Sequence, residues 1–286
     1  MTASLLDGEA LAARIKAGLR AEISALKARG VTPGLGTILV GDDAPSARYV
    51  EMKHEDCAAM GIASAQVHLP ATASQAEVLE AVRRFNGDEG VSAFLVQVPL
   101  PAHIDAAEVL LAVDPRKDVD GLHPVNLGLL VQGTPRALPC TPQGIVELLA
   151  DNDVPVEGRH VVIIGRGLTI GRPLAVLLSL KRAGCNAAVT VLHSGVGDLG
   201  SYVATADVVV AAAGRAGLVT PEMVKPGAAV VGAGTTFVGR RVLSDVDEGV
   251  AEVAGWMTPR LGGVGPMTRA MLLRNAVQAA GRAAQA

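Results

Sequence analysis

Tyr49 and Lys53 are the first side chains whose types and spacing could support catalysis. They stand four residues apart in a segment that predicts a helix over residues 46–60, so both project from one face of it. A single lysine on a helix is ordinarily a solvated surface residue. This helix, however, follows a short apolar strand at 35–40 and a turn at 41–46, and catalytic groups gather at the carboxyl ends of parallel strands. Lys53 is therefore a candidate catalytic residue.

Gln97 and Asp120 are two further polar candidates. Gln97 lies in the last part of an apolar strand predicted over 93–98, where a buried glutamine must find hydrogen-bond partners in the backbone or in another group of the site. Asp118 and Asp120 precede Gly121, and two carboxylates without histidine or further acids make a poor metal site. We expect no bound metal. Asp120 fits either a hydrogen-bond acceptor for a ligand or a turn former before the glycine.

A glycine-rich turn marks the candidate nucleotide site. The apolar strand 160–164 runs into Gly165-Arg166-Gly167, and Gly171 follows where a helix is predicted to begin. Glycines at a strand-to-helix turn let the backbone approach a pyrophosphate, which then rests on the amide groups of the helix N-terminus. The Gly-x-Gly-x-x-x-Gly spacing is one residue longer than the usual dinucleotide fingerprint, so a plain tight turn is the alternative interpretation.

The end of the next predicted strand indicates which dinucleotide this site prefers. A site for NAD usually places Asp or Glu there, to accept a hydrogen bond from the ribose 2′-hydroxyl. Here the chain reads Leu192-His193-Ser194, with no acid. Arg166 could offer a cation and Ser194 a hydroxyl to a 2′-phosphate, although Ser194 could equally cap a helix or turn. The sequence therefore favours NADP over NAD.

The composition is typical of stacked α/β layers. The 286 residues are 50% hydrophobic and only 2% aromatic, and they include 33 glycines, as aliphatic cores with tight strand-to-helix turns require. The net charge is −3, and charged residues of neither sign are clustered along the chain. The sequence therefore indicates no surface for nucleic acid or an anionic membrane. Cys57, Cys140 and Cys185 lie far apart and predict reduced thiols. No segment predicts a signal peptide or membrane span, so we expect a soluble, cytoplasmic protein.

Strands and helices alternate along both halves of the chain, which predicts an α/β fold with two domains. In the first half, the strand predictions at 35–40, 67–69 and 93–98 are separated by helices and give a βαβαβ unit. In the second half, the strand beginning at residue 160 and those at 188–192, 208–212 and 229–231 give a Rossmann-like unit. We place the first domain at 1–120, completed by a last helix at 267–286. A linker follows at 121–141, and the second domain spans 142–266.

Seven segments of the chain together resemble the bifunctional methylenetetrahydrofolate dehydrogenase/methenyltetrahydrofolate cyclohydrolase family. Each segment alone is unremarkable, but all seven occur in the family's order and with suitable spacing over nearly the full length. They are residues 38–43, Tyr49-Val50 with Lys53, residues 96–101, 117–121 and 139–142, the loop from Gly165, and residues 262–268.

The resemblance implies an NADP-dependent enzyme of one-carbon metabolism that performs two reactions in one cleft between a folate domain and an NADP domain. Hydride passes from 5,10-methylenetetrahydrofolate to NADP+, and the resulting methenyl cation is then hydrolysed to 10-formyltetrahydrofolate. The family role of Lys53 is general acid and base, Gln97 holds and tunes it, Tyr49 packs on the folate linker, and Asp120 binds the pterin. Family members are commonly homodimers joined through the nucleotide domain.

The same resemblance implies which further residues contact the ligands. The substrate would also contact residues beside Gln97 and in a glycine-rich segment near the C-terminus: Val96, Val98, Leu261, Gly262, Gly263, Val264 and Gly265. The cofactor would contact Gly165, Arg166, Gly167, Ser194 and Thr235. For the glycine-rich segment, a plain loop is the alternative interpretation.

Four positions depart from the family pattern. Gly167 replaces a usual serine, Gly232 a common aspartate, Thr235 an isoleucine, and Leu261 a proline. Gly167, Gly232 and Thr235 give the nearest alternative, a protein that is mainly a cyclohydrolase with weak or altered dehydrogenase activity. A non-catalytic dinucleotide-binding protein is a third interpretation, but it would not require the lysine. A generic amino-acid or hydroxy-acid dehydrogenase would explain only the second half.

Overall fold

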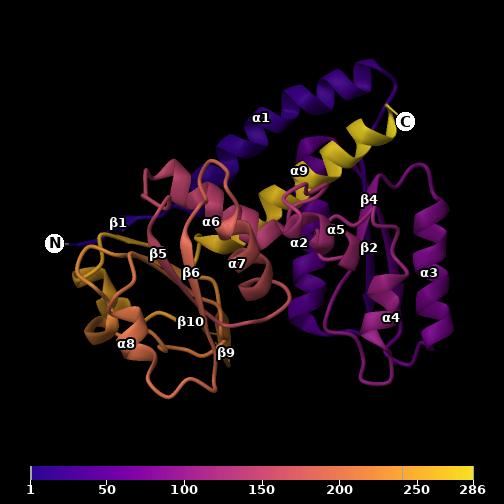
Figure 1. Ribbon diagram of the computed structural model, residues 1–286. Coiled ribbons are helices and arrows are strands. Elements are labelled where there is room, and N and C mark those ends of the chain that lie inside the picture. Colours follow the sequence, from indigo (N-terminus) through magenta and orange to yellow (C-terminus); the bar gives the residue numbers. More distant parts are fainter. Residues whose placement is uncertain (1, 240, 286) are drawn as a thin grey trace. The chain divides into compact units, whose positions relative to one another are not determined.

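A computed structural model describes residues 2–239 and 241–285, and these divide into two compact units (Figure 1). The six-stranded unit contains the described residues up to Ala13 together with Thr141–Thr268. The three-stranded unit contains Arg14–Cys140 and the described residues from Arg269 onward. Each unit is an α/β arrangement on a parallel sheet, which agrees with the predicted fold class.

The three-stranded sheet has the order β3-β2-β4 and is parallel throughout. Its central strand is buried along its whole length, as expected for an apolar strand with neighbours on both sides. Phe85 and Phe94 meet edge to face in its core, with ring centroids 5.5 Å apart. The strands are β2 (Gly34–Val40), β3 (Ala63–Leu69) and β4 (Ala93–Val96).

Local capping signals set the helices of this unit. In α2 (Ala44–Met60), the Asp43 side chain accepts a hydrogen bond from the Ser46 backbone N–H at 3.0 Å, and Gly61 ends the helix in the left-handed conformation. In α3 (Gln75–Gly87), Ser74 and Glu77 form a capping box. The unit also holds α4 (Ala106–Leu111), α5 (Pro124–Val131) and most of α1 (Gly8–Ala28).

The six-stranded sheet is parallel in every pairing, with the order β1-β11-β8-β7-β5-β6. Strand β5 lies between β6 and β7, so the direction in which strands are added along the chain reverses at β5. In open parallel sheets, ligands bind beyond the carboxyl ends of the strands at such a reversal. The strands are β1 (Ser4–Leu5), β5 (His160–Ile164), β6 (Ala188–Leu192), β7 (Val208–Ala211), β8 (Ala229–Gly232) and β11 (Trp256–Met257).

Helices and a hairpin complete the six-stranded unit. The helical elements are most of α6 (Cys140–Asp151), α7 (Gly171–Ser179), α8 (Leu199–Val203), η1 (Pro221–Met223) and η2 (Glu248–Glu252). The antiparallel hairpin consists of β9 (Thr235–Val238) and β10 (Arg241–Ser244). Within the described residues, no helix is both long and apolar enough to cross a membrane.

The two units differ from the expected boundaries at both ends of the chain. The N-terminal residues join the six-stranded unit because β1 pairs with β11 and the Leu6 N–H donates to the Met257 carbonyl at 2.9 Å. The last helix, α9 (Val264–Ala283), enters the three-stranded unit from Arg269 onward. Residues 121–140, expected as a linker, belong to that unit too and include α5.

Candidate active site

Lys53 and Gln97 form the centre of the candidate site in the three-stranded unit. Lys53 lies on α2 and is only 9% exposed, and its Nζ donates to Gln97 Oε1 at 3.0 Å. Gln97 directly follows β4, and its backbone N–H donates to the Ile38 carbonyl at 2.8 Å. Gln97 Nε2 donates to the Val98 carbonyl at 2.8 Å, which fixes the amide with its oxygen toward the lysine. The two predicted residues therefore meet at the carboxyl end of a strand.

The surroundings of Lys53 lower its pKa, so its ammonium loses a proton more readily. Burial lowers the pKa of Lys53, while the charge of the nearby Asp120 acts in the opposite direction. Burial also raises the pKa of Asp120, against the attraction of Lys53. The pKa of the buried Cys140 thiol lies well above its ordinary value, mainly because of desolvation, so this thiol stays protonated at neutral pH. Lys53 is thus more readily neutral than a lysine in water.

Asp118 and Asp120 serve different purposes. Asp118 accepts hydrogen bonds from the backbone N–H groups of Gly121 and His123 at 3.1 and 2.8 Å, and from Asn126 Nδ2 at 2.8 Å. It therefore shapes its own loop. Across residues 2–239 and 241–285, no protein group hydrogen-bonds the Asp120 carboxylate, and no three His, Cys, Asp or Glu residues are grouped to hold a metal ion. Asp120 is available to a ligand.

Asn275 holds the backbone on both sides of this loop. Its Nδ2 donates to the carbonyls of Val119 and Leu138, both at 2.9 Å, and lies 3.4 Å from Cys140 Sγ. The Cys140 backbone N–H in turn donates to the Asp120 carbonyl at 3.2 Å. Sequence reasoning did not single out Asn275. A polar residue among the apolar positions of α9 was the available signal.

A second unpredicted contact involves His54, the residue that follows Lys53 in α2. Thr37, fully buried in β2, hydrogen-bonds His54 Nε2 at 2.8 Å and ties α2 to the central strand. Burial, and then the charge of Lys53, lowers the pKa of His54. The neutral imidazole can therefore keep this bond while standing next to the lysine.

The other predicted substrate residues near Lys53 differ in exposure. Tyr49 is 45% exposed one helical turn before Lys53, and Val98 is equally exposed beyond Gln97. Both side chains can contact a ligand. Val96 is buried in the core of β4, so only its backbone could do so.

The glycine-rich turn lies in the six-stranded unit, between β5 and α7. Gly165 has φ +123°, and a Cβ atom there would lie 2.2 Å from the Ala212 carbonyl oxygen. A Cβ at Gly171 would lie 2.1 Å from the Gly165 carbonyl oxygen, whereas Gly167 faces open space. The fold therefore requires the first and third glycines of the predicted motif and leaves the second free.

The donor set beside this turn suits a phosphate-bearing nucleotide. Arg166 and Gly167 are exposed in the turn, and Ser194 is exposed just beyond β6. The two segments are neighbours, because the Gly165 N–H donates to the Leu192 carbonyl at 2.8 Å. A guanidinium, a hydroxyl and open backbone amides match the oxygens of a phosphorylated ribose and a pyrophosphate.

Asp245 is a functional candidate that sequence reasoning missed. This fully buried carboxylate accepts hydrogen bonds from three successive backbone N–H groups, those of Ala213 (2.7 Å), Gly214 (2.9 Å) and Arg215 (2.7 Å). These residues follow β7, at the strand reversal where a ligand is expected. A Cβ at Gly234 would lie 2.0 Å from Asp245 Oδ2. Asp245 therefore sets the shape of the loop after β7.

The departures at Gly232 and Thr235 have different surroundings. A Cβ at Gly232 would lie 2.5 Å from Ser244 Oγ, and the Gly232 N–H donates to Thr258 Oγ1 at 2.8 Å. Ser244 and Thr258 thus occupy the space that a larger residue would need. Thr235 begins β9 and is exposed.

The predicted substrate segment from Leu261 to Gly265 lies in the six-stranded unit. Gly262 accepts a hydrogen bond from the Glu9 N–H at 2.9 Å, and a Cβ at Gly8 would lie only 1.8 Å from the Gly263 carbonyl oxygen. Close packing against the start of α1 therefore accounts for part of this glycine content. Leu261 is 60% exposed, and Val264 and Gly265 begin α9.

Two family models match the chain. The tetrahydrofolate dehydrogenase/cyclohydrolase catalytic domain matches residues 6–120, and the NAD(P)-binding domain of the same family matches residues 139–284. The chain is similar to the bifunctional protein FolD of Syntrophotalea carbinolica, with 54% identity over 98% of this chain and 97% of the relative. FolD 1 of Salinispora tropica is also 54% identical, over 97% of this chain and 90% of the relative.

Solved structures give the same picture. Superposition on the bifunctional FolD enzyme of Campylobacter jejuni gives a TM-score of 0.94 at 41% sequence identity. The match covers 98% of this chain and 99% of the Campylobacter jejuni chain. The Trypanosoma brucei methylenetetrahydrofolate dehydrogenase-cyclohydrolase, solved with NADP and an inhibitor, has a TM-score of 0.95 at 40% identity over the full length of both chains.

Proposed function

Because the chain belongs to the tetrahydrofolate dehydrogenase/cyclohydrolase family, we propose that Lys53 is the acid–base group of its hydrolytic reaction. The protein is a bifunctional, NADP-dependent enzyme. It oxidises 5,10-methylenetetrahydrofolate to 5,10-methenyltetrahydrofolate and hydrolyses that product to 10-formyltetrahydrofolate. The observation that carries the assignment of Lys53 is its buried amine, held 3.0 Å from Gln97 Oε1 at the end of β4.

The hydrolysis requires a group that first accepts and then returns a proton. Water adds to the electron-poor carbon of the methenyl cation, and the neutral amine of Lys53 takes the proton that the water loses. The ammonium then protonates the pterin-side nitrogen as its bond to that carbon breaks, and the hydroxyl proton leaves to solvent. The formyl group remains on the other nitrogen, one water is consumed, and one proton is released overall.

Gln97 and Asp120 prepare Lys53 for this role. The Gln97 oxygen accepts from the amine and keeps it oriented, since the Gln97 amide is fixed by the Val98 carbonyl. The Asp120 charge opposes the effect of burial on the Lys53 pKa, which keeps the ammonium form accessible for the second half of the reaction. Asp120 also offers its carboxylate to the donor groups of the pterin, and Tyr49 offers an exposed ring to the flat part of the folate.

The cofactor would be held by the turn after β5 and by the loops beside it. Arg166 and Ser194 would bind the 2′-phosphate, and the backbone at Gly165 and Gly167 would receive the pyrophosphate. Thr235 would lie near the nicotinamide. When bound, NADP+ accepts the hydride that the methylene bridge loses. The protein's contribution to that reaction is positioning, because hydride transfer needs no protein acid.

The test compares Lys53→Met with Lys27→Met, an exposed lysine on α1. We expect K53M to lower the rate of methenyltetrahydrofolate hydrolysis by about 10²–10⁴-fold, the usual contribution of a general acid–base group. Methenyl formation with NADP+ and binding of folate should persist, and K27M should behave as wild type. Hydrolysis by K53M near the wild-type rate would contradict the assignment.

We also propose that the protein is a cytoplasmic homodimer associated through the six-stranded unit. β6 ends that sheet and leaves Val189 and Val191 only partly buried, which offers an aliphatic edge to a second copy. Sedimentation equilibrium on wild type and on a Val189→Lys variant tests this. A monomeric wild type, or a dimer unaffected by V189K, would contradict the proposed interface.

A further inference from the structure

The three-stranded unit contains a cavity of about 880 Å³ at the amino-terminal ends of its strands. Thr32 lies in its lining two residues before β2, and Ser92 lies there just before β4. Gln97, by contrast, follows the carboxyl end of β4. Four residues of strand, about 13 Å, separate the two edges. The cavity is therefore distinct from the site around Lys53.

Basic residues outnumber acidic ones among the charged side chains that line this cavity. Four of its side chains are cations, Arg116, Lys117, Arg136 and Arg282, and two are acids, Glu89 and Asp114. Arg116 and Asp114 neutralise each other, since the guanidinium holds the carboxylate at 2.6 to 3.1 Å. Of the other charged side chains in the lining, three are then cations and one, Glu89, is an acid.

Arg136 and Arg282 form an uncompensated pair of like charges. Arg136 reaches the cavity from the segment after α5, and Arg282 from the last turn of α9. Among the described residues, neither guanidinium has an ion pair or a hydrogen bond to a protein group. Burial, and then the charge of Arg136, lowers the pKa of Arg282. An anion between them would replace this repulsion with two charge-assisted contacts.

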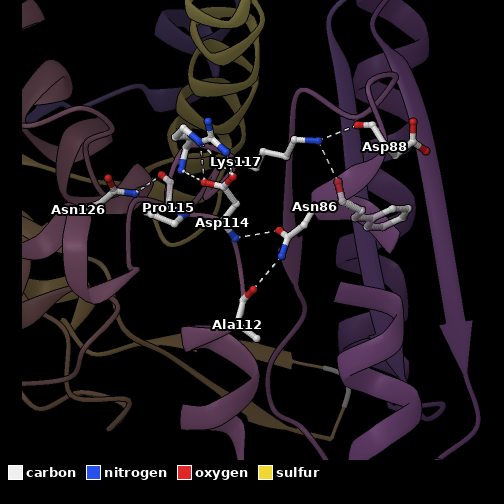
Figure 2. A network of polar contacts seen from close by, with 9 residues as sticks. Asn86, Asp88, Ala112, Asp114, Pro115, Lys117 and Asn126 are labelled. Carbon is white, nitrogen blue, oxygen red and sulfur yellow. Dashed lines mark hydrogen bonds and ion pairs between the residues drawn. The ribbon is translucent and has the colours of Figure 1, made fainter. Parts of the chain in front are cut away.

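The part of the lining around Asn86 and Lys117 is held in place by hydrogen bonds (Figure 2). Lys117 Nζ donates to the carbonyls of Phe85 and Asp88 at 3.0 and 2.7 Å, so its ammonium is fixed without a carboxylate bound to it. Asn86 accepts from the Asp114 N–H at 2.8 Å and donates to the Ala112 carbonyl at 2.8 Å. The Lys117 cation in the lining is therefore preorganised.

We propose that this cavity binds a small organic anion with two or more negative charges, held chiefly by Arg136 and Arg282 and steered by the fixed charge of Lys117. Its volume is that of a small-molecule site. Phosphate esters and polycarboxylates share the required chemistry, since both present pairs of charged oxygens to the planar guanidinium. This inference does not rest on the proposed function.

The experiment is calorimetric titration of the enzyme with its cofactor site saturated by NADP+, so that the glycine-rich turn cannot take up the probe. Inorganic pyrophosphate and citrate are titrated separately, and the tighter of the two identifies the phosphate or the carboxylate class. We expect one site per chain for at least one probe, with an affinity that falls as salt is raised. Absence of binding by both probes would overturn the proposal.

Arg136→Glu provides the decisive variant. Arg136 is exposed, so the substitution should not disturb the core, and it places a carboxylate beside Arg282 where the anion is expected. We expect R136E to bind the probe at least about tenfold more weakly, which corresponds to about 1.4 kcal/mol, and to melt no lower than wild type. The control Arg20→Glu changes an exposed arginine outside the cavity by the same charge and should bind normally. Unchanged binding in R136E, or equal loss in R20E, would refute the site.

Discussion

Replacing Asp245 by asparagine tests whether one buried carboxylate shapes the loop after β7. The carboxylate accepts three backbone N–H groups, those of Ala213 and Gly214 on Oδ2 and that of Arg215 on Oδ1. Asparagine has a single acceptor oxygen. In the amide orientation that keeps more hydrogen bonds, this oxygen takes the place of Oδ2 and accepts from Ala213 and Gly214, and the NH₂ group faces the Arg215 N–H. One bond is then lost, and the other two lose the assistance of the charge.

The cost of D245N follows from these three bonds. A hydrogen bond to a charged group contributes about 1.5–3 kcal/mol, and a neutral one about 0.5–1.5 kcal/mol. Losing one charged bond and weakening two gives a decrease of about 3–5 kcal/mol in the free energy of unfolding, a large share of the roughly 5–15 kcal/mol that a folded protein has. The loop lies at the strand reversal, so we also expect weaker binding of NADP+, by about tenfold or more.

Urea denaturation followed by circular dichroism measures the first effect, and fluorescence titration with NADP+ measures the second. The matched control is Asp247→Asn, two residues away and exposed; within the described part of the chain its side chain accepts a single hydrogen bond, from the Gly249 N–H at 2.8 Å. Its expected cost is about 1 kcal/mol or less. If D245N unfolds within about 0.5 kcal/mol of wild type and binds NADP+ normally, the role assigned to Asp245 is incorrect.

Two further predictions concern the glycine-rich turn and the pH dependence of hydrolysis. Gly165→Ala should abolish NADP+ binding or folding, because the alanine Cβ would lie 2.2 Å from the Ala212 carbonyl oxygen. The control Gly167→Ala should fold as wild type, since its Cβ would face open space. Melting curves and NADP+ titration distinguish these outcomes. Hydrolysis should be present above the lowered pKa of Lys53 and lost as pH falls through it, since only the neutral amine accepts a proton. Asp120→Asn removes the charge that raises this pKa, so the acidic limb of the kcat profile should move to lower pH; a limb that stays in place or moves upward would contradict the coupling.

The parts of the site that could be predicted are those determined by local sequence. Lys53 and Gln97 each follow an apolar strand in a βαβ pattern, and parallel strands bring their carboxyl ends to one edge. Gly165 could be identified because a strand-to-helix turn there needs a positive φ.

The unpredicted parts depend on contacts between distant segments. Asp245 is 30 to 32 residues beyond the loop residues that it holds, and it directly follows the β9–β10 hairpin. Asn275 contacts carbonyls that are more than 130 residues earlier in the chain. β1 has only two residues, too few for any hydrophobic period to reveal it, so the N-terminal boundary could not be predicted.

The order in which the ribosome delivers these segments has a consequence for how the enzyme matures. Neither unit is a continuous stretch of chain, because each is completed by residues from the opposite terminus. Domains generally fold during synthesis from the N-terminus. Here, however, the carbonyls of Val119 and Leu138 receive their donor from Asn275, which is among the last residues to be translated. The backbone around Asp120 therefore reaches its final state only near the end of translation, and a nascent chain truncated before α9 would lack it.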